Sequence, residues 1–517
     1  MAHASGDKSQ TDKGSAPMFG DIARQFEDSR KLIIAANRGP LSFTEAHAGE
    51  LIPRPDWTRG YEQFEPLSNI DISWVTGAIS AADRAAADSL SDSDGLVQND
   101  VLPDAWTTRF VSMPRRIHHR FYNVICNPLL WFMLHRSWSP TFTPNIAKDE
   151  HDAWERGYKT VNESFAMAVV DLAGDDEIMF LCRDYQLMLV PGIVRSKRPS
   201  AAIHQSFETP WPWPSDFEVL PTGWRQELLM SLLASDVISF PSSRDIDAFV
   251  ACAVSALGDR VHVDVEVPNL LSFGNHPVQL AVSAPAVRSS KFKKITNLET
   301  IQRAIDRLDE WNGKHTFITV DRAEPHKNIV RSINAFGELL RRNSELNEQV
   351  RFLLFITPGP SHISAYKRLM DEIRRSIRRI NDKSNGTNPV QIREDGNFSR
   401  AVAALATYDT LVSVPLVDGI GRSVLDGALI NSKQGNMILS ESSAVADFLA
   451  NNASLVGFSD TEAMTVAMSD AVSETSAIRS AKSSSIRDAV EKALTASDNG
   501  LPVLEILERL ATIASNR

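Results

Sequence analysis

Charged residues follow several short apolar segments of the chain, in positions where they could bind a polar ligand. Arg183 and Asp184 come directly after Ile178–Cys182, and Glu208 comes after Ala201–Phe207. Apolar runs of this length are typical of parallel strands that are buried on both faces. Open α/β sheets bind their ligands beyond the carboxyl ends of such strands, so these three side chains are candidates for binding hydroxyl groups. Taken singly, each of them could equally have a structural role.

A second group of charges suits a diphosphate. Arg322 and Lys327 lie between the predicted strand Thr316–Val320 and the predicted helix Ile329–Arg342. Two cations in front of a helix add to the partial positive charge of its N-terminus. A diphosphate fits this position, and if it were a leaving group, its growing negative charge would make these cations stabilise the transition state more than the ground state. The alternative is that they only form ion pairs with neighbouring acidic residues.

Two further turns carry residues that suit the same ligands. The turn after Leu411–Val414 offers amides, carboxylates and one cation to a ligand such as a diphosphate: Asp418, Gly419, Gly421, Arg422 and Asp426. The carboxylate of Asp426 would hold ribose hydroxyls. Arg38 follows the predicted strand Lys31–Ala36, and its forked guanidinium could bind a phosphate or a sugar hydroxyl.

Aromatic residues gather in two places. Arg115–Pro140 is predicted to contain a helix that packs Phe121, Ile125 and Leu129 inward, with ligand binding as the alternative for any single residue. The loop Thr209–Pro214 alternates proline with tryptophan. It cannot pair as a central strand because proline lacks the N–H donor. We predict that this loop forms a stiff aromatic wall of the cleft.

The bulk composition excludes several classes of protein. The formal net charge of −11 argues against nucleic-acid binding, which needs a basic face. Cys126, Cys182 and Cys252 lie far apart, so neither a disulfide framework nor a CxxC metal site is expected. No run of about twenty apolar residues predicts a membrane span, and the N-terminus lacks the apolar segment of a signal peptide. We therefore expect a cytoplasmic protein.

The length predicts two domains, because 517 residues are too many for one hydrophobic core. Strands alternate with helices, which predicts parallel sheets with right-handed crossovers. We expect two Rossmann-like α/β domains that face each other across a cleft. The predicted boundaries are a disordered tail at 1–28, an N-terminal domain at 29–285, a C-terminal domain at 286–490, and a helix at 491–517 that braces the N-terminal domain. The interdomain linker is placed within His276–Ser290.

Two missing patterns narrow the chemistry. The chain has no GxGxxG stretch, which argues against a dinucleotide-dependent oxidoreductase. It also lacks a cluster of histidine and cysteine at metal-ligand spacing, and the neighbours His118 and His119 point apart on a helix. We expect neither a metal ion nor a cofactor.

Several of these motifs resemble those of the trehalose-6-phosphate synthase family, glycosyltransferase family 20, and of related pseudo-glycosyltransferases that couple cyclitols. In that family one strand ends in His-Asp-Tyr-x-Leu and the next in His-x-Pro-Phe/Trp-Pro. This chain reads RDYQL at 183–187 and ETPWP at 208–212, so the aspartate matches while both histidines are replaced. The resemblance continues through Asn37-Arg38-Gly39, Arg322–Lys327 and Asp418-Gly419, and covers roughly residues 30 to 490.

The resemblance implies a GT-B fold and transfer from a nucleotide sugar with retention of configuration and without a metal ion. The residues that it implies as catalytic are Asp184, Glu208, Arg322 and Lys327. The donor would be bound by Arg322, Lys327, Asp418, Gly419, Gly421, Arg422 and Asp426. The acceptor would be bound by Arg38, Tyr122, Trp131, Arg183 and Asp184. Where the family reads Asp-Gly-x-Asn-Leu-x-x-x-Glu, this chain has glycine, arginine and a shorter acid at the last three motif positions.

Departures from the family pattern point to a different acceptor. Glu208 puts a carboxylate, which only accepts hydrogen bonds at neutral pH, in place of a histidine, and an ion pair with Arg183 is one expected consequence. No glycine-rich loop follows Gly39, and Pro360 stands where the family has an arginine for the acceptor's phosphate. We expect a hexosyltransferase of specialised metabolism, such as antibiotic biosynthesis. It would use a nucleotide sugar such as UDP-glucose and a small, non-phosphorylated polyol, cyclitol or nucleoside.

Three alternatives stay open. One is a pseudo-glycosyltransferase that couples a nucleotide-activated cyclitol to an amino-cyclitol, and another is trehalose-6-phosphate synthase itself. The third, from a different class, is a catalytically silent homologue that senses sugars or regulates a partner. The sequence also leaves open a homo-oligomer.

Overall fold

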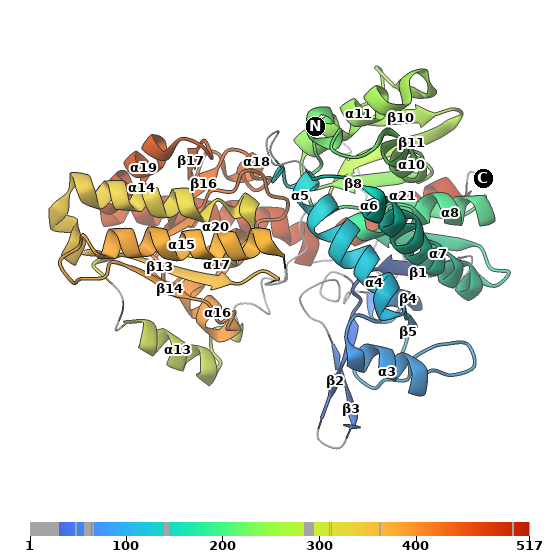
Figure 1. The fold of residues 1–517 in the computed structure, drawn as a ribbon, viewed down its shortest axis with the longest axis horizontal. Coiled ribbons are helices and arrows are strands. Elements are labelled where there is room, and N and C mark those ends of the chain that lie inside the picture. The colour runs from blue at the N-terminus through green and yellow to red at the C-terminus, as the bar shows by residue number, and fades with distance from the viewer. Residues whose placement is uncertain are drawn as a thin grey trace, which may run out of the picture.

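The protein consists of two halves, each built on its own β-sheet (Figure 1). The computed structural model describes residues 30–46, 49–55, 64, 67–138, 144–283, 294–309, 311, 313–360, 363–498 and 501–515. The predicted tail at 1–28 lies outside these residues. None of the described helices is long and apolar enough to cross a membrane.

The first half contains a nine-stranded sheet in the order β5-β4-β1-β6-β7-β8-β11-β10-β9. Its strands are β1 (Lys31–Ala36), β4 (Ile72–Gly77), β5 (Trp106–Val111), β6 (Ile178–Arg183), β7 (Ala202–Ser206), β8 (Val237–Phe240), β9 (Val261–Val263), β10 (Leu270–Phe273) and β11 (His276–Val282). Neighbours pair in parallel except β10, which is antiparallel to β9 and β11. A hairpin of β2 (Leu41–Glu45) and β3 (Leu51–Pro55) projects from this half (Figure 1).

The second half contains a six-stranded parallel sheet in the order β14-β13-β12-β15-β16-β17. Its strands are β12 (His315–Arg322), β13 (Val350–Thr357), β14 (Val390–Arg393), β15 (Thr410–Ser413), β16 (Asn436–Ser440) and β17 (Ser454–Val456). When these six strands are numbered by their order in the chain, their order in the sheet is 3-2-1-4-5-6. The six strands β5-β4-β1-β6-β7-β8 of the first half have the same order. That is the order of a doubly wound Rossmann sheet, whose ligands bind where the strand order reverses. The reversals fall between β1 and β6 and between β12 and β15, the strands that the predicted site residues follow.

Helices connect the parallel strands and cover both sheets. The first half contains α3 (Ala81–Ser89), α4 (Arg115–His118), the π-helix η3 (His119–Leu130), α5 (Trp131–Leu134), α6 (Lys148–Ala153), the π-helix η4 (Trp154–Lys159), α7 (Thr160–Ala173), α8 (Val190–Lys197), α9 (Pro214–Phe217), α10 (Thr222–Leu232) and α11 (Ser243–Leu257). The rest of the chain adds α13 (Glu299–Asp309), α14 (Ile329–Arg342), α15 (Ser364–Asn381), α16 (Phe398–Thr407), α17 (Arg422–Ile430), α18 (Ala446–Leu449), α19 (Thr461–Ser473), α20 (Ser476–Asp498) and α21 (Leu501–Ser515).

The central parallel strands of each sheet are buried on both faces, as their continuous apolar runs predict. In β1, Ile33 and Ala35 face one core with α7, α10 and α11, while Leu32 and Ile34 face the other with α3. The two faces alternate because successive side chains of a strand point in opposite directions. The second sheet is likewise enclosed, by α14, α15 and α19 on one face and by α13, α16, α17 and α20 on the other.

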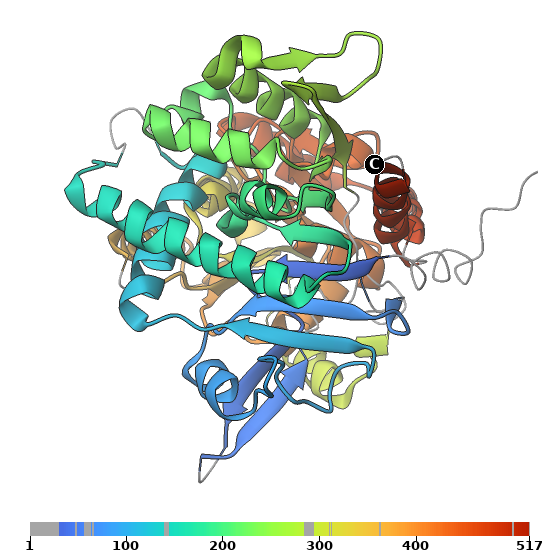
Figure 2. The ribbon, with the colours of Figure 1, turned by 90° about the vertical axis from the view of Figure 1, so that its right-hand side faces the viewer.

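The C-terminal helix α21 packs on the first half although it follows the second half in the chain. Leu507 and Leu510 are fully buried against the core face that Leu32 and Ile34 share. Figure 2 shows α21 beside the first half, next to the marked C-terminus. The contact lies where the sequence predicts a bracing helix, so α20 and α21 tie the two halves together.

The structure corrects three predictions. The loop Thr209–Pro214 is no aromatic wall, because Trp211 is buried in the core against Phe240 and Phe249. The predicted linker begins too early: the first part of His276–Ser290 is strand β11, which pairs with β8, and 284–290 lie outside the described residues.

The third correction concerns the helix predicted within Arg115–Pro140. Phe121, Ile125 and Leu129 are buried as predicted, but they lie in the π-helix His119–Leu130, which leaves helical geometry at Asn127 (φ −139°, ψ 113°). The cause is the proline that follows, which disfavours helical angles for the residue before it.

Candidate functional site

A cavity of about 530 Å³ lies between the carboxyl ends of the two sheets. Its lining includes most of the predicted site residues: Arg38, Tyr122, Trp131, Arg183, Asp184, Glu208, Arg322, Lys327, Asp418 and Arg422. Both halves contribute to it, so the cavity bridges the two Rossmann sheets. Gly419, Gly421 and Asp426 are not among the lining residues.

Lys327 is positioned by a turn that few residue types can form. After β12, Pro325–Lys327 makes a single turn of 3₁₀-helix, and Asn328 takes a left-handed conformation (φ 59°, ψ 25°). Asparagine adopts this conformation more readily than most residues. Its side-chain amide donates to the carbonyls of Val414 (2.9 Å) and Phe458 (2.7 Å), which locks the turn to the neighbouring elements. Lys327 therefore points into the cavity from a fixed backbone.

Two carboxylates flank Lys327. Its Nζ lies 2.7 Å from Oδ2 of Asp418 and 3.2 Å from Oδ1 of Asp321. Burial alone would lower the pKa of Lys327, but the two carboxylates outweigh burial and raise it above its ordinary value. Burial raises the pKa of Asp321, and the charge of Lys327 opposes that rise. The site thus holds a permanent cation before any ligand binds.

Trp131 of the first half contacts two residues at the carboxyl end of β12 in the second half. The guanidinium of Arg322 lies over the indole ring, 5.2 Å from its centre, and the indole N–H donates to Glu324 at 3.1 Å. Burial raises the pKa of Glu324, and the neighbouring Arg322 opposes this rise. The contact joins the predicted acceptor and donor sides of the cavity.

Asp184 has a strained backbone. Its φ of 67° and ψ of 174° lie in a region that is almost exclusive to glycine. The backbone is held there because the Asp184 N–H donates to the carbonyl of Ser206 (2.7 Å) and its carbonyl accepts from the side chain of Gln205 (3.1 Å). Strain that the surrounding structure maintains in this way is typical of functional sites.

Arg183 and Glu208 form the ion pair that the sequence predicts. The Arg183 side chain is 9% exposed and lies over the ring of Phe64, whereas Glu208 is 52% exposed. The carbonyl of Glu208 also meets the second half: a Cβ at Gly419 would stand 2.1 Å from its oxygen. Because residue 419 is a glycine, its loop in the second half can lie directly against the backbone of Glu208 in the first half.

The remaining predicted donor residues lie behind the cavity. Asp426 is buried, and its Oδ2 is 3.9 Å from Nε of Arg422, whose own side chain reaches the cavity. Gly421 caps α17 and leaves the N-terminus of that helix beside the site. Their roles in donor binding stay predictions.

Three histidines in the lining were not predicted: His204 on β7, and the pair His135 and His326. His135 follows α5 in the first half, and His326 lies beside Lys327 in the second. Their rings stack with centres 4.1 Å apart. The signal for His326 was its place between two proposed ligand residues in one turn, but His135 lies nearly two hundred residues away, so the pair could be found only in three dimensions. Other unpredicted lining residues include Asn127, Glu324, Arg393 and Asn397.

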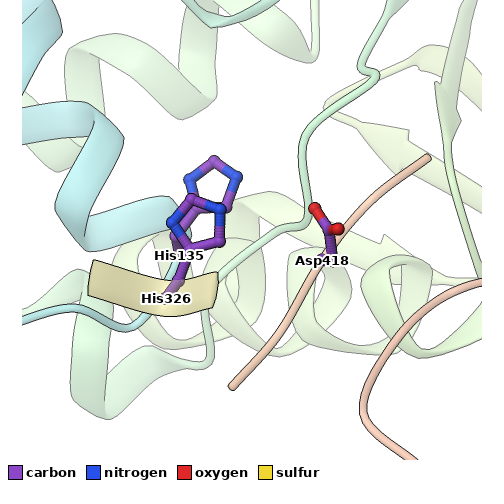
Figure 3. A group of neighbouring side chains, drawn as sticks. All are labelled: His135, His326 and Asp418. Carbon is purple, nitrogen blue, oxygen red and sulfur yellow. The ribbon is translucent and has the colours of Figure 1, made fainter. Parts of the chain in front are cut away.

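His135, His326 and Asp418 form a compact group whose possible ligand atoms lie within 4.8 Å of one another (Figure 3). The ring geometry does not suit one metal ion. An ion must lie in the plane of each ring, but these planes are inclined by only 27° with centres 4.1 Å apart, so they intersect far beyond a metal–nitrogen bond of about 2.1 Å. Asp418 is also paired with the cation Lys327. The group would have to rearrange before it could bind a metal.

Comparison with solved structures defines the fold. The E. coli trehalose-6-phosphate protein that was solved with UDP-2-fluoro glucose bound is similar with a TM-score of 0.77, over 92% of this chain and 99% of that chain, at 18% identity. Two Rossmann-like sheets facing one cavity, arranged as in that protein, make this a GT-B fold, as predicted.

The sequence places the protein within that class. Residues 33–497 match the model of glycosyltransferase family 20, so the chain belongs to this family. The match confirms the predicted class of enzyme, a glycosyltransferase.

Two curated relatives show how broad the family is. The bifunctional trehalose-6-phosphate synthase/phosphatase of Thermoproteus tenax is 27% identical over 64% of this chain and 44% of the relative, so the chain spans less than half of that protein. Validamine 7-phosphate valienyltransferase of Streptomyces hygroscopicus subsp. jinggangensis is 24% identical over 81% of this chain and 82% of the relative.

Proposed function

We propose that the protein is a retaining hexosyltransferase that takes its sugar from a nucleotide donor of the UDP-glucose type. The observation that carries this proposal is the position of Lys327. It is held as a cation at the strand reversal of the second sheet and faces, across one cavity, the strained Asp184 of the first sheet. A fixed cation opposite a hydroxyl-binding carboxylate suits transfer of a sugar from a diphosphate.

In the proposed reaction, the bond between the anomeric carbon and the diphosphate breaks while the acceptor oxygen bonds to the same carbon. The proton of the acceptor passes to the leaving phosphate, so the protein needs no general base. Arg322 and Lys327 stabilise the charge that the diphosphate gains. Asp184 orients hydroxyl groups, and its fixed backbone reduces the entropy lost in doing so.

We further propose a small acceptor without a phosphate group. Arg183 and Glu208 occupy the rim where the acceptor would bind, and their ion pair uses the charge of Arg183 that could otherwise bind a phosphate. Carboxylate and guanidinium together suit a polyol, a cyclitol or a nucleoside, because hydroxyl groups both donate and accept hydrogen bonds. Pro360 also provides no cation at the position where the family resemblance implies an arginine that binds the acceptor's phosphate.

A pseudo-glycosyltransferase is the second candidate. The valienyltransferase of Streptomyces matches four fifths of both chains, which favours a nucleotide-activated cyclitol as donor. The relative's name includes a phosphorylated acceptor, whereas the acceptor rim here leads us to propose a non-phosphorylated one.

Calorimetric titration with UDP, GDP, ADP and their glucose conjugates tests the proposal. We expect one nucleotide to bind in the micromolar range, and Lys327→Met to weaken that binding at least about tenfold, since a charge-assisted hydrogen bond contributes roughly 1.5–3 kcal/mol. Lys367→Ala, which removes an exposed cation on α15, is the matched control and should bind as the wild type does. If no nucleotide binds to the wild type, the donor site is wrong and a sensing or regulatory role takes precedence.

A further inference from the structure

His326 is buried beside the proposed diphosphate site, and its polar atoms have no partner within the described chain. It is 1% exposed and lines the cavity. Neither Nδ1 nor Nε2 makes a hydrogen bond to a described residue. A buried polar group without a partner is costly, roughly 1–3 kcal/mol, and such groups call for an explanation.

The neighbours hold the ring of His326 in place without satisfying its nitrogens. His135 stacks on it at 27°, and the indole of Trp131 meets it edge-on at 5.7 Å (Figure 3 shows the two stacked rings). His135 is oriented in turn, because its Nδ1 lies 2.8 Å from the carbonyl of Trp131 and must donate to it. The backbone carbonyl of His326 accepts from Leu416 at 2.7 Å, so its main chain is fixed as well. The ring is therefore fixed, while its Nδ1 and Nε2 have no hydrogen-bond partner among the described residues.

A ligand oxygen is the group that would give this ring a hydrogen-bond partner. His326 precedes Lys327 in the same turn and follows Arg322 by four residues, so all three side chains surround one part of the cavity. Two of them are cations already assigned to the diphosphate. We propose that His326 is the third hydrogen-bond donor to the diphosphate of the nucleotide donor, and that it takes up a proton when the diphosphate binds. This inference rests on the proposed function.

The charges around the ring explain why proton uptake would accompany binding. In the empty site burial, followed by His135, Lys327 and Arg322, holds the pKa of His326 well below its ordinary value, so the ring is neutral. The carboxylates nearby are Asp418 and Glu324, and each already faces a cation. A diphosphate brings at least two negative charges into hydrogen-bond distance, which favours the protonated ring. The resulting charge-assisted hydrogen bond is about twice as strong as a neutral one.

Calorimetry in buffers of different ionisation enthalpy tests the inference at pH 7. We expect the wild type to take up as much as one proton per diphosphate bound, and to take up none with the corresponding nucleoside monophosphate. His326→Phe keeps the ring stack but has no N–H, so it should lose the proton uptake and bind the diphosphate about tenfold to hundredfold more weakly. Its affinity for the monophosphate should not change.

His326→Gln separates hydrogen bonding from protonation. Glutamine donates an N–H but cannot be protonated, so affinity should fall less than in His326→Phe while proton uptake is lost. Thermal unfolding of both variants checks that the fold is retained, and His262→Gln on the exposed edge strand β9 is the control for loss of a histidine elsewhere.

Three results would overturn the inference, and only the last of them would also overturn the proposed function. Proton uptake that persists in His326→Phe places the titrating group elsewhere and leaves the proposed function intact. Diphosphate binding that requires an added divalent cation and is lost with a chelator would make the histidine pair a metal site, contrary to its present geometry. A wild type that binds no nucleotide at all would remove the proposed function together with the inference.

Discussion

We call the residues at the carboxyl ends of a sheet's strands its rim. The rims of the two sheets share one strand order, but their charged residues differ in burial and pairing. In the second rim, Lys327, Asp321 and Asp418 have side chains that are 13%, 14% and 9% exposed, and they are paired before any ligand binds. In the first rim, Glu208 is 52% exposed and only its partner Arg183 is buried. One rim is a preformed set of charges, while the other presents a carboxylate to solvent.

This difference matches the sequence pattern. The second rim keeps the arginine and lysine that its family resemblance implies, whereas the first rim has replaced both of its histidines. Charges that stabilise a leaving group act best when they are fixed in advance and excluded from water, so little variation is tolerated there. Charged residues on an exposed rim can be replaced at a small cost in folding stability, because exposed ion pairs contribute little. The donor turn also departs from the family motif, at Gly421, Arg422 and Asp426, so the contrast applies to the cations Arg322 and Lys327 and not to the donor side as a whole.

The largest effect should come from Arg322 in the second rim. Arg322→Ala removes one cation from the leaving diphosphate, and we expect kcat to fall about 10²- to 10³-fold, or ~2.7–4 kcal/mol, as for loss of one oxyanion donor. Arg322→Lys should recover only part of this loss, because lysine keeps the charge but lacks the forked guanidinium that lies over Trp131. Steady-state kinetics with the donor identified by calorimetry measures both variants. Equal losses in kcat from Arg38→Ala in the first rim would remove the contrast between the rims.

Acid should weaken both halves in the same way. Each sheet contains a buried histidine that bonds a hydroxyl on the next strand: His204 with Ser239 and His315 with Thr410, both at 2.9 Å. Burial lowers the pKa to about 3 for His204 and to about 4 for His315. In the unfolded chain these rings are protonated below about pH 6.5, whereas in the folded protein they stay neutral.

Their contribution to stability is therefore complete above pH 6.5 and is lost as the pH falls towards 4. Each ring should add a slope of up to about 1.4 kcal/mol per pH unit to the free energy of unfolding. Urea denaturation between pH 7 and pH 4.5, followed by circular dichroism, measures this slope. His315→Gln should reduce it, and His262→Gln, on the exposed edge strand β9, should not. A slope that is unchanged in His315→Gln would mean that other groups dominate acid unfolding.

The fold could be predicted from sequence because its signals are local. Short apolar runs such as Lys31–Ala36 and Leu411–Val414 fix the strands, and alternation with helices fixes the parallel topology. The predictions failed where one local sequence pattern is compatible with two different structures. Trp211 lies in a proline-rich loop, which suggested a wall of the cleft, yet the ring is large and apolar and the core had room for it. The π-helix η3 also escaped prediction, since its pattern of inward residues repeats every four positions as in an α-helix.

The site could be predicted where a residue follows a strand or matches a motif of the family, as Tyr122 and Trp131 do. Arg322, Lys327 and Asp184 were found because each follows the carboxyl end of a predicted strand and matches a motif of the family. His135 and His326 were missed since their meeting depends on how the two halves approach each other, which no local pattern contains. The strain at Asp184 was equally hidden, because it arises from hydrogen bonds to the neighbouring strand's Ser206 and Gln205.

The smallest effect tests the first rim directly. Because Glu208 is half exposed, its coupling to Arg183 should be only about 0.5–1 kcal/mol, as for other solvent-screened ion pairs. Glu208→Gln, Arg183→Met and the double variant form a cycle in which unfolding free energies give this coupling. It should shrink further at about 1 M salt, where the Debye length is about 3 Å. None of the three variants should change the affinity for the nucleotide. A coupling above about 3 kcal/mol that salt does not reduce would show that the first rim is as rigidly paired as the second, and the acceptor side would then have to be as selective for charge as the donor side.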